Sequence, residues 1–409
     1  MRILILVDCY LPSTKSSAKL IHDLAFAFQQ LEHESIIVTP DETLPQKSSV
    51  SLEDGVTVLR IKTGRMKGAS KIVRGFNEAN LSSVLWHRGK SFFEAHPCDL
   101  IVYYSPSIFF GALVRRLKKL FCCPSYLILR DIFPQWAVDA GLLHKGLVYK
   151  FFRHKELEQY KAADIIGVQS PANLHYFSGI GMRGPYRLEV LYNWTSLVEQ
   201  SIPVCSYRNQ LGLENKVVFF YGGNMGIAQD MDNMMRLAKR LRARQEIQFL
   251  FVGDGSEVPR LKAQIAAEGL KNVAIHSAVG QQEYLAMLSE FDVGLISLDR
   301  NLKTQNFPGK MLGYMYHAMP ILASVNPGND LKEILETHHA GLVSVNGDDD
   351  LLYEHALCLV ESPGQRKRIG LNGRKLLEGI FSVSRAAEQV LSACHDIPAQ
   401  RAREERRQT

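Results

Sequence analysis

Short apolar strands alternate with amphipathic helices along the whole sequence, and this alternation constrains the fold more than any other feature. Each expected strand is a nearly unbroken apolar run, which is typical of a strand buried on both faces of a parallel sheet. The alternation pauses near residues 196–210, where the polar segment SLVEQSIPVCSYRNQLGL contains a proline, and then starts again. The sequence therefore predicts an α/β protein with two doubly wound, Rossmann-like domains.

The expected strands form two series, one on each side of this linker. Those of the first series are Ile3–Val7, Ser35–Thr39, Val56–Ile61, Leu100–Tyr104, Ser125–Leu129, Ile165–Gln169 and Leu188–Tyr192. Those of the second are Val217–Tyr221, Gln248–Val252, Val273–His276, Val293–Leu298, Ile321–Ala323 and Gly341–Val343. A chain of 409 residues exceeds one comfortable core, which also favours two domains.

Composition excludes several classes of protein. Hydrophobic residues make up 46% of the chain and charged residues 22%, as in soluble globular proteins. No segment reaches the roughly 18 uninterrupted apolar residues that span a bilayer, and the start MRILILVDCYLP lacks the features of a signal peptide. We therefore expect a protein that is neither exported nor transmembrane.

The cysteines point to the same compartment. They form no CxxC pair, so we expect reduced, buried thiols in the cytoplasm and no metal site. The seven are Cys9, Cys98, Cys122, Cys123, Cys205, Cys358 and Cys394.

The net charge of +6 belongs to the first half of the chain. Residues 1–200 hold 24 Lys and Arg against 18 Asp and Glu, while residues 201–409 hold 24 against 24. This asymmetry favours an anionic partner for the first half, either phospholipid or a phosphorylated acceptor. The Arg and aromatic clusters of a nucleic-acid-binding module are absent from the sequence, so no nucleic acid is expected.

Three glycine-rich loops follow strands of the second series. They are YGGNMG with Gly222, Gly223 and Asn224, VGDG with Gly253, Asp254 and Gly255, and FPGK with Pro308, Gly309 and Lys310. Ligands of open α/β sheets bind beyond the carboxyl ends of the strands, where all three loops are expected. A single loop of this kind is as often only a tight turn, but three in one domain indicate a nucleotide-diphosphate site.

The third loop opens a predicted helix within Phe307–Pro320, with apolar residues at Met311, Leu312, Met315, Tyr316 and Met319. Amide groups at a helix start lack internal partners, and Lys310 adds a full positive charge, so the turn is a candidate anion site. The alternative is an ordinary strand–turn–helix with a solvated lysine.

Taken together, the order of these motifs resembles the family 4 glycosyltransferases, which are retaining enzymes with the GT-B fold. The resemblance covers nearly the whole chain, through DCYLPSTKSSAKLIHDLA, LRDIFPQWAVDAG, VQSPANLHYF, VLYNW, YGGNMG, VGDG and FPGKMLGYMYHAMPILA. Within the family it looks most like bacterial O-antigen and capsule enzymes that transfer N-acetyl-L-fucosamine or a related aminosugar.

The resemblance implies a role for each domain. Residues 1–199 would bind a polyprenyl-diphosphate-linked acceptor, residues 200–383 a UDP-sugar donor, and residues 384–409 would form a helix returning to the first domain, followed by a polar tail. It also implies the GT-B arrangement, in which the two domains face each other across a cleft. The protein would then work in the cytoplasm, peripherally on the inner face of the plasma membrane.

The resemblance also carries over individual positions. Gly222, Gly223 and Asn224 match the segment near the donor diphosphate, Lys310 matches the basic residue of the P-x-K turn, and Gly253 to Gly255 match a loop near the base. On the acceptor side, Ser16, Ser17, Ala18 and Lys19 take the place of a glycine-rich loop, and Asp131 in RDIFP matches a D-x-x-P aspartate. For Lys19 the alternative is a solvated helix lysine, and for Asp131 a turn-capping loop aspartate.

The chain departs from the family at two donor positions. Many members carry two glutamates eight residues apart that bind the sugar and the ribose, and here the matching residues are Gln305 and Gly313. A missing ribose carboxylate removes a charge-assisted hydrogen bond worth roughly 1.5 to 3 kcal/mol when buried. Either the donor is held differently or activity is impaired.

The expected chemistry needs no protein nucleophile, cofactor or metal. Lys310 and the Gly223 and Asn224 amides would stabilise the departing diphosphate, while Asp131 orients or deprotonates the acceptor hydroxyl. Two alternatives stay open, a UDP-aminosugar 2-epimerase of the same fold and a non-catalytic partner that binds nucleotide sugar.

A basic amphipathic helix is expected over residues 109–121, with Arg115, Arg116, Lys118 and Lys119 on one face. Such a face suits an anionic membrane surface, and the segment 144–161 adds charge in the same domain. A crossover helix that buries one face and solvates the other explains the pattern equally well.

Overall fold

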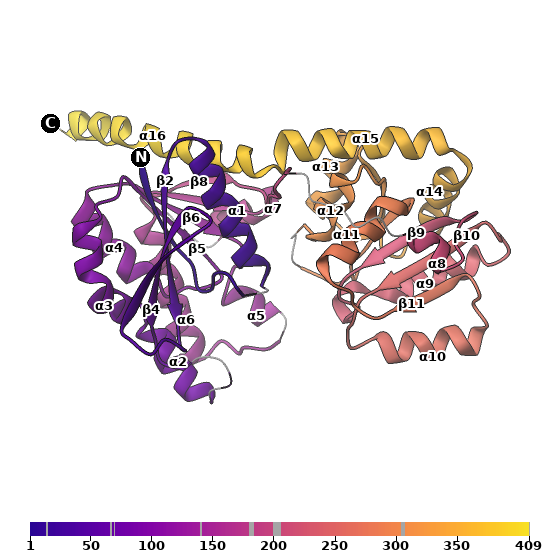
Figure 1. The fold of residues 1–409 in the computed structure, drawn as a ribbon, viewed down its shortest axis with the longest axis horizontal. Coiled ribbons are helices and arrows are strands. Elements are labelled where there is room, and N and C mark those ends of the chain that lie inside the picture. Colours follow the sequence, from indigo (N-terminus) through magenta and orange to yellow (C-terminus); the bar gives the residue numbers. More distant parts are fainter. Residues whose placement is uncertain are drawn as a thin grey trace. The chain divides into compact units, whose positions relative to one another are not determined.

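The computed structural model describes residues 1–13, 15–65, 68, 70–139, 141–179, 184–198, 206–303 and 307–408. The chain divides into two compact units (Figure 1). The amino-terminal unit comprises Met1–Ser196 together with Val383–Thr409, and the carboxy-terminal unit comprises Leu197–Ser382. Each unit has its own sheet, and the expected α/β class with two doubly wound sheets is confirmed.

The amino-terminal sheet has eight strands in the order β3-β4-β2-β1-β5-β6-β7-β8, parallel except for the β3–β4 pair. Its strands are β1 (Arg2–Leu6), β2 (Glu34–Asp41), β3 (Ser48–Glu53), β4 (Val56–Lys62), β5 (Leu100–Tyr104), β6 (Ser125–Leu129), β7 (Ile165–Val168) and β8 (Arg187–Val190). Its helices are α1 (Ser16–Gln30), α2 (Lys71–Ala79), α3 (Leu81–Ala95), α4 (Gly111–Phe121), α5 (Gln135–Asp139), α6 (Leu147–Ala162), α7 (Pro171–Gly179) and α16 (Val383–Gln408).

Both faces of this sheet are buried, which explains the unbroken apolar strands. In β1, Ile3 and Ile5 join the core beneath α1 and α16, while Leu4 and Leu6 join the core beneath α3 and α4. The last helix of the chain therefore contributes to the first unit's core. The Val383 amide at its start donates to the Thr195 carbonyl over 3.0 Å.

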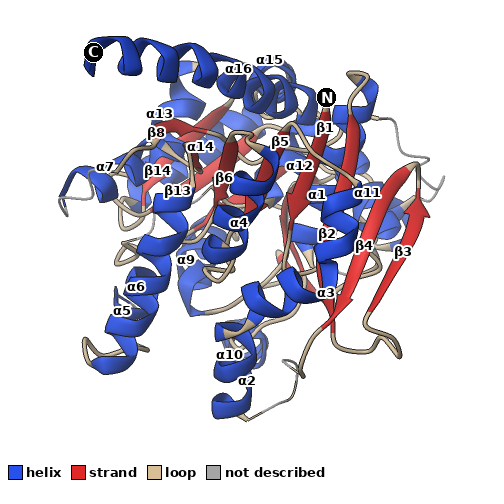
Figure 2. Ribbon diagram, turned by 90° about the vertical axis from the view of Figure 1, so that its left-hand side faces the viewer, coloured by secondary structure: helices blue, strands red, loops and turns tan. Residues whose placement is uncertain are grey.

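Strand β3 is the strand that was not predicted. It pairs antiparallel with β4 at the edge of the sheet (Figure 2), through a two-residue turn at Asp54 and Gly55. Both turn residues have positive φ, 50° and 80°, which is the geometry that an Asp-Gly pair favours in tight hairpins. The strand was not predicted because its apolar residues alternate with polar ones and do not form an apolar run.

The carboxy-terminal sheet has six parallel strands in the order β11-β10-β9-β12-β13-β14. Its strands are β9 (Val217–Gly222), β10 (Ile247–Val252), β11 (Val273–His276), β12 (Val293–Ser297), β13 (Ile321–Val325) and β14 (Gly341–Val345). Its helices are α8 (Tyr207–Gln210), α9 (Met231–Arg240), α10 (Val258–Glu268), α11 (Gln281–Glu290), α12 (Lys310–Tyr316), α13 (Asp330–Thr337), α14 (Asp349–Glu361) and α15 (Pro363–Ile380), with a 3-10 turn at Ile227–Gln229.

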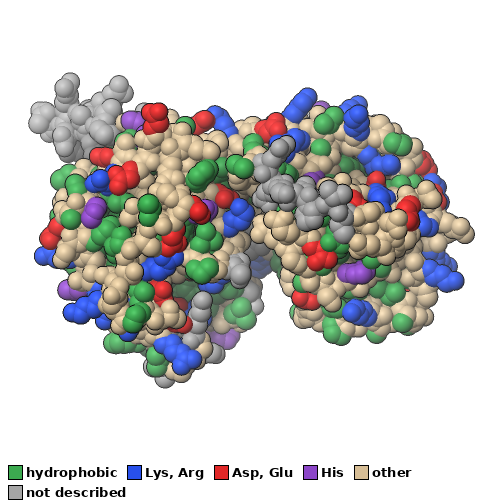
Figure 3. All heavy atoms as spheres, viewed as in Figure 1, with side chains coloured by type: hydrophobic (Ala, Val, Ile, Leu, Met, Phe, Trp, Pro, Cys, Tyr) green, Lys and Arg blue, Asp and Glu red, His purple; other side chains and the backbone are tan. Residues whose placement is uncertain are grey.

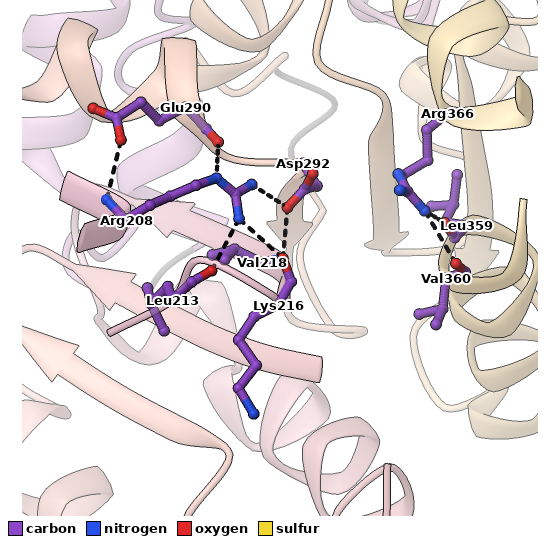
Figure 4. Close-up of polar contacts among 9 residues, drawn as sticks. All are labelled: Arg208, Leu213, Lys216, Val218, Glu290, Asp292, Leu359, Val360 and Arg366. Atoms are coloured by element: carbon purple, nitrogen blue, oxygen red, sulfur yellow. Dashed lines mark hydrogen bonds and ion pairs between the residues drawn. The ribbon is translucent and has the colours of Figure 1, made fainter. Parts of the chain in front are cut away.

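Arg208 holds α8 against the edge of this sheet where the strands begin (Figure 4). Its guanidinium donates to the carbonyls of Glu290 (2.7 Å) and Lys216 (2.9 Å) and pairs with the Asp292 carboxylate (2.5 Å). Asp292 also accepts the Val218 amide over 2.8 Å. One side chain therefore ties α8, the end of α11 and the start of β9 together.

The charged side chains, the helices and the cysteines can each be compared with the expectations from the sequence. Side chains of both charges are spread over both units in the view of Figure 3. Within the described ranges, no helix is both long and apolar enough to cross a membrane. Four described cysteines are buried free thiols, but the expectation of burial is wrong for Cys122 and Cys358, which are exposed. Cys205 lies outside the described residues.

Candidate functional site

The order of the strands fixes where each sheet can bind a ligand. In the carboxy-terminal sheet the order in which successive strands are added reverses between β9 and β12, and in the amino-terminal sheet it reverses between β1 and β5. Loops that leave the carboxyl ends of these strands diverge and expose the sheet edge, where open α/β sheets bind ligands. The candidate residues are therefore described for each unit at this edge.

The YGGNMG and VGDG loops lie directly against each other beyond β9 and β10. The Gly223 amide donates to the Val252 carbonyl over 2.9 Å, and the Met225 amide donates to the Asp254 carbonyl over 2.8 Å. A Cβ atom on Gly253 would lie 2.0 Å from the Gly223 carbonyl oxygen. Only glycine allows this approach, so these residues are explained first by loop pairing.

This pairing corrects one expectation. The Gly223 amide already has a backbone acceptor and is not available to a diphosphate, and the Gly222 amide donates to the Tyr314 hydroxyl over 3.2 Å. The Asn224 side chain donates to the Gln229 side chain over 2.8 Å, while the residue itself remains exposed. Among the main-chain donors predicted for the diphosphate, the Asn224 amide is the remaining candidate.

Lys310 lies beside these loops as expected. Its ammonium is 3.2 Å from the centroid of the Tyr221 ring, and a Cβ atom on Gly223 would lie 3.7 Å from the lysine Nζ. Within the described part of the chain, no carboxylate forms an ion pair with Lys310. Burial therefore lowers the pKa of Lys310 well below its ordinary value, with no nearby negative charge to oppose this shift. Among the described residues, the site therefore has a lysine amine held in place without an acidic partner.

Helix α12 is shorter than the sequence suggested. It begins at Lys310 but ends at Tyr316, and Met319 follows Ala318, whose φ of 51° lies in the left-handed region. Pro308 and Gly309 precede it, and Gly309 has an ordinary helical φ of −58°. With fewer than two full turns, α12 contributes little dipole, so the positive charge comes mainly from Lys310.

Two tyrosines that were not predicted pack against Gly222 in the YGGNMG loop. The Tyr314 hydroxyl accepts the Gly222 amide, and a Cβ atom on Gly222 would lie 2.3 Å from the Tyr284 ring. Burial raises the pKa of Tyr314 well above its ordinary value, so this hydroxyl stays protonated. Sequence periodicity predicted Tyr316 on the apolar face of α12, but Tyr314 is the fully buried tyrosine of this helix.

Of the two positions that depart from the family pattern, the structure describes Gly313. Gln305 lies outside the described residues. Gly313 is on α12, and a Cβ atom there would lie 3.1 Å from the Leu288 side chain on α11. A side chain at position 313 would therefore have to displace the end of the Leu288 side chain by a few tenths of an ångström.

Asp131 follows β6 at the ligand edge of the amino-terminal sheet. Burial raises its pKa, the Arg130 guanidinium opposes this shift, and the charge of Asp8 adds to it. Asp8 follows β1 and was not predicted; its Oδ1 is buried and has no hydrogen-bond partner among the described residues. The sheet edge thus has two neighbouring carboxyl groups whose pKa values are both raised, chiefly by burial.

The remaining acceptor-side residues are on α1. The Lys19 ammonium pairs with Asp23 one turn later at 2.9 Å, as a solvated helix lysine commonly does. Ser16 begins the helix, and the Ser17 hydroxyl lies 3.2 Å from the Cys9 sulfur. These contacts account for the side chains of Lys19 and Ser17 without a ligand.

A cavity of about 340 Å³ opens beyond β4, between α2 and α3. It is lined by Thr63, Gly64, Phe76, Asn77, Asn80, Leu81, Ser83, Val84, His87 and Arg88. Its lining residues come from a loop and two helices without a shared motif, so no sequence pattern predicted it.

Comparisons with known proteins show similarity to glycosyltransferases. Residues 206–376 match the family described as Glycosyl transferases group 1. The chain is 26% identical over 218 residues to the probable glycosyltransferase WbjE of Pseudomonas aeruginosa, covering 51% of this chain and 53% of WbjE. It is 26% identical over 251 residues to the putative colanic acid biosynthesis glycosyl transferase WcaI of Escherichia coli, covering 58% of this chain and 60% of WcaI. The chain thus spans a little over half the length of these curated relatives.

A solved structure resembles the chain over nearly its full length. The crystal structure of HepE from Anabaena in complex with UDP superposes with a TM-score of 0.66 at 16% identity, covering 96% of this chain and 99% of HepE. At this identity the likeness concerns the fold. The chain has the two-domain GT-B fold, and its residues 206–376 match the glycosyl transferases group 1.

Proposed function

We propose that this protein is a retaining glycosyltransferase that moves a sugar from a UDP-sugar to a polyprenyl-diphosphate-linked saccharide. The observation that carries the proposal is Lys310, a largely buried ammonium beside Gly223 that has no carboxylate partner in the described chain. A lysine in this setting gains a charge-assisted contact when a phosphate group arrives. Its position at the ligand edge of the sheet is where a nucleotide diphosphate would bind.

The donor diphosphate would contact two groups of the carboxy-terminal unit. Lys310 supplies the charge and the Asn224 amide a fixed donor, and both would stabilise the negative charge that develops as the UDP departs. Gly253, Asp254 and Gly255 would lie near the nucleotide base, and Gln305, Pro308 and Gly309 near the sugar or diphosphate. That HepE, similar in fold, was crystallised with UDP supports UDP as the nucleotide.

The acceptor would bind the amino-terminal unit near Asp131 and the start of α1. A carboxyl group with a raised pKa is a better proton acceptor once ionised, so Asp131 would orient or deprotonate the attacking hydroxyl. Attack on the same face as the leaving group needs no protein nucleophile. Catalysis would then rest on positioning and electrostatics.

The relatives and the resemblance support a biological setting for this activity. WcaI is named for colanic acid biosynthesis, which supports a polysaccharide product. The proposals of an O-antigen or capsule product, and of N-acetyl-L-fucosamine or a related aminosugar as the transferred group, rest on the resemblance to the family 4 glycosyltransferases. A polyprenyl-linked acceptor would bring the enzyme to the inner face of the plasma membrane.

The direct test is a transfer assay with the full chain, a panel of UDP-sugars and a polyprenyl-linked saccharide. We expect UDP release with one donor, only when the acceptor is present, and loss of release in Lys310→Ala. Lys239→Ala is the matched control, since Lys239 is in the last turn of α9, away from the ligand edge. A UDP-aminosugar isomerised without acceptor would indicate an epimerase, and donor binding without any UDP release would indicate a non-catalytic partner. Either result contradicts the proposal.

A further inference from the structure

We infer that the protein docks on anionic lipid through a surface formed by α5 and the start of α6. Five large apolar side chains are exposed there: Trp136 (40%), Leu142 (73%), Leu147 (84%), Val148 (58%) and Phe151 (41%). We name this surface the α5–α6 tip. Exposed apolar clusters on soluble proteins commonly mark interaction sites, because leaving such side chains in water is unfavourable.

Aromatic contacts connect α5 to the start of α6 in the tip. The Phe133 ring lies 6.1 Å from Trp136 on one side and 5.0 Å from Phe152 on the other, and Phe152 lies 5.5 Å from Phe151. The Leu142 amide donates to the Ala137 carbonyl over 2.8 Å, which holds the α5–α6 loop against α5. The exposed side chains are thus supported by a packed aromatic layer.

Spacing along α6 separates apolar from basic positions. Leu147 and Phe151 are four residues apart, so they project from the same face, and Val148 extends it. Lys150 lies beside this face, and Lys145 is two residues before the start of the helix. Both lysines are exposed. Apolar side chains flanked by lysines suit the boundary between lipid headgroups and acyl chains.

The positive charge of the segment that carries the tip favours anionic lipid as its partner. Residues 142–155 contain Lys145, Lys150, Arg153 and Lys155 and no Asp or Glu. Arg153 pairs with Glu156 and Lys155 with Glu158, whereas Lys145 and Lys150 have no ion pair within the described ranges. An anionic surface supplies the missing counter-charge, and its acyl region takes up the aliphatic side chains, which nucleic acid would leave in water.

The contacts of the basic side chains on α4 argue against this helix as the docking face. Arg115 pairs with Glu158, Lys118 with Asp164 at 2.7 Å, and the Arg116 guanidinium lies over the Trp86 ring. Three of the four cations expected to face a membrane are therefore used in contacts with neighbouring helices. The α5–α6 tip replaces α4 as the structural basis for membrane association.

The inference can be tested by co-sedimentation of the full chain with vesicles of phosphatidylcholine alone or with 30% phosphatidylglycerol. We expect binding to the anionic vesicles only, decreasing with salt. Replacing Lys145→Glu and Lys150→Glu should weaken it at least fivefold per lysine, taking about 1 kcal/mol for each basic residue. Leu147→Ser with Phe151→Ser should weaken it roughly tenfold or more through lost apolar burial.

The controls separate this surface from others. Leu52→Ser removes an apolar side chain that is 74% exposed on β3, and Lys119→Glu reverses an exposed cation on α4. Both should bind vesicles like the wild type. Wild-type binding by the tip variants, loss of binding in Lys119→Glu, or self-association through the tip in place of vesicle binding would overturn the inference.

The inferred docking rests on the proposed function only for its purpose, which would be to bring the enzyme to a lipid-linked acceptor. UDP binding by the tip variants, measured in the same preparations, keeps the two claims apart. We expect it to be unchanged, because the tip and the donor loops belong to different units. Failure of vesicle binding with intact UDP binding would reject the docking surface alone.

Discussion

The backbone of Gly253 lies so close to the Gly223 carbonyl that a Cβ atom on Gly253 would be 2.0 Å from that oxygen. Gly253 also has a φ of 149°, which other residues rarely adopt. Position 253 therefore requires glycine for two reasons. There is no space for a Cβ atom, and the backbone has a conformation that other residues rarely adopt. Because Gly223 lies beside Lys310, the spacing of these loops also sets the position of the proposed diphosphate site.

Gly253→Ala should consequently destabilise the carboxy-terminal unit and weaken UDP binding. We expect a loss of about 1 to 3 kcal/mol in the free energy of unfolding, the range for a clash combined with an unfavourable φ. Gly309→Ala is the control, because Gly309 has a helical φ and nothing lies near its added Cβ atom. Chemical denaturation of the two variants measures the difference, and equal stability would contradict the proposed loop contact.

Lys310 should make UDP affinity depend on pH. Burial lowers its pKa in the free protein, and a bound diphosphate would raise it again. Below the lowered pKa the lysine is already charged and affinity is at its highest. Above the lowered pKa, the protein must take up a proton when UDP binds. UDP affinity therefore falls by up to tenfold per pH unit until the pH reaches the pKa of Lys310 in the bound state.

Isothermal titration between about pH 7.5 and 10 would measure this, since phosphate groups ionise near pH 6 and are then constant. Heats recorded in buffers of different ionisation enthalpy should show proton uptake. Lys310→Met should bind more weakly and show no uptake. A wild-type affinity that is flat or rises over this range would refute the role of the lysine charge.

Asp131 should control the acid side of the rate profile. It must be ionised to accept a proton, so kcat/KM should fall as pH falls through its raised pKa. Asp131→Asn should lower turnover about 100-fold or more, the size of a general-base effect, with UDP affinity unchanged. Asp139→Asn, on the exposed end of α5, serves as the control. Full activity of Asp131→Asn would leave this residue with a purely structural role.

Arg208 should be important for stability alone. Removing its side chain leaves Asp292 without its guanidinium partner and frees the carbonyls of Glu290 and Lys216. We expect Arg208→Ala to lower the free energy of unfolding by about 2 to 4 kcal/mol. Arg242→Ala, an exposed residue at the end of α9, should change it by about 0.5 kcal/mol or less. Comparable losses for the two variants would show that the network of Figure 4 contributes little.

The sequence predicted the strands well where burial alone determines them. Leu100–Tyr104 and Ser125–Leu129 were predicted to the residue, because a strand buried on both faces must be apolar throughout. It missed Ser48–Glu53, where an edge strand needs only alternate apolar residues. It also extended α12 beyond Tyr316, because local periodicity does not indicate the left-handed conformation of Ala318.

The candidate site was predictable in its loops but not in its hydrogen bonds. Glycine spacing indicated where the backbone approaches closely, yet it could not show that the Gly223 amide is already bonded to Val252. Asp8 was missed for a similar reason. Its relation to Asp131 exists only after β1 and β6 are placed in one sheet, since 123 residues separate them in the chain.

The central claim is that Lys310 binds the diphosphate of a UDP-sugar, and UDP titration of Lys310→Ala tests it most directly. Losing a charge-assisted contact of about 1.5 to 3 kcal/mol should weaken UDP binding by about 10- to 100-fold. Lys310→Arg should recover part of the affinity, and Lys239→Ala should match the wild type. If Lys310→Ala binds UDP as tightly as the wild type does, the diphosphate lies elsewhere and the account is contradicted.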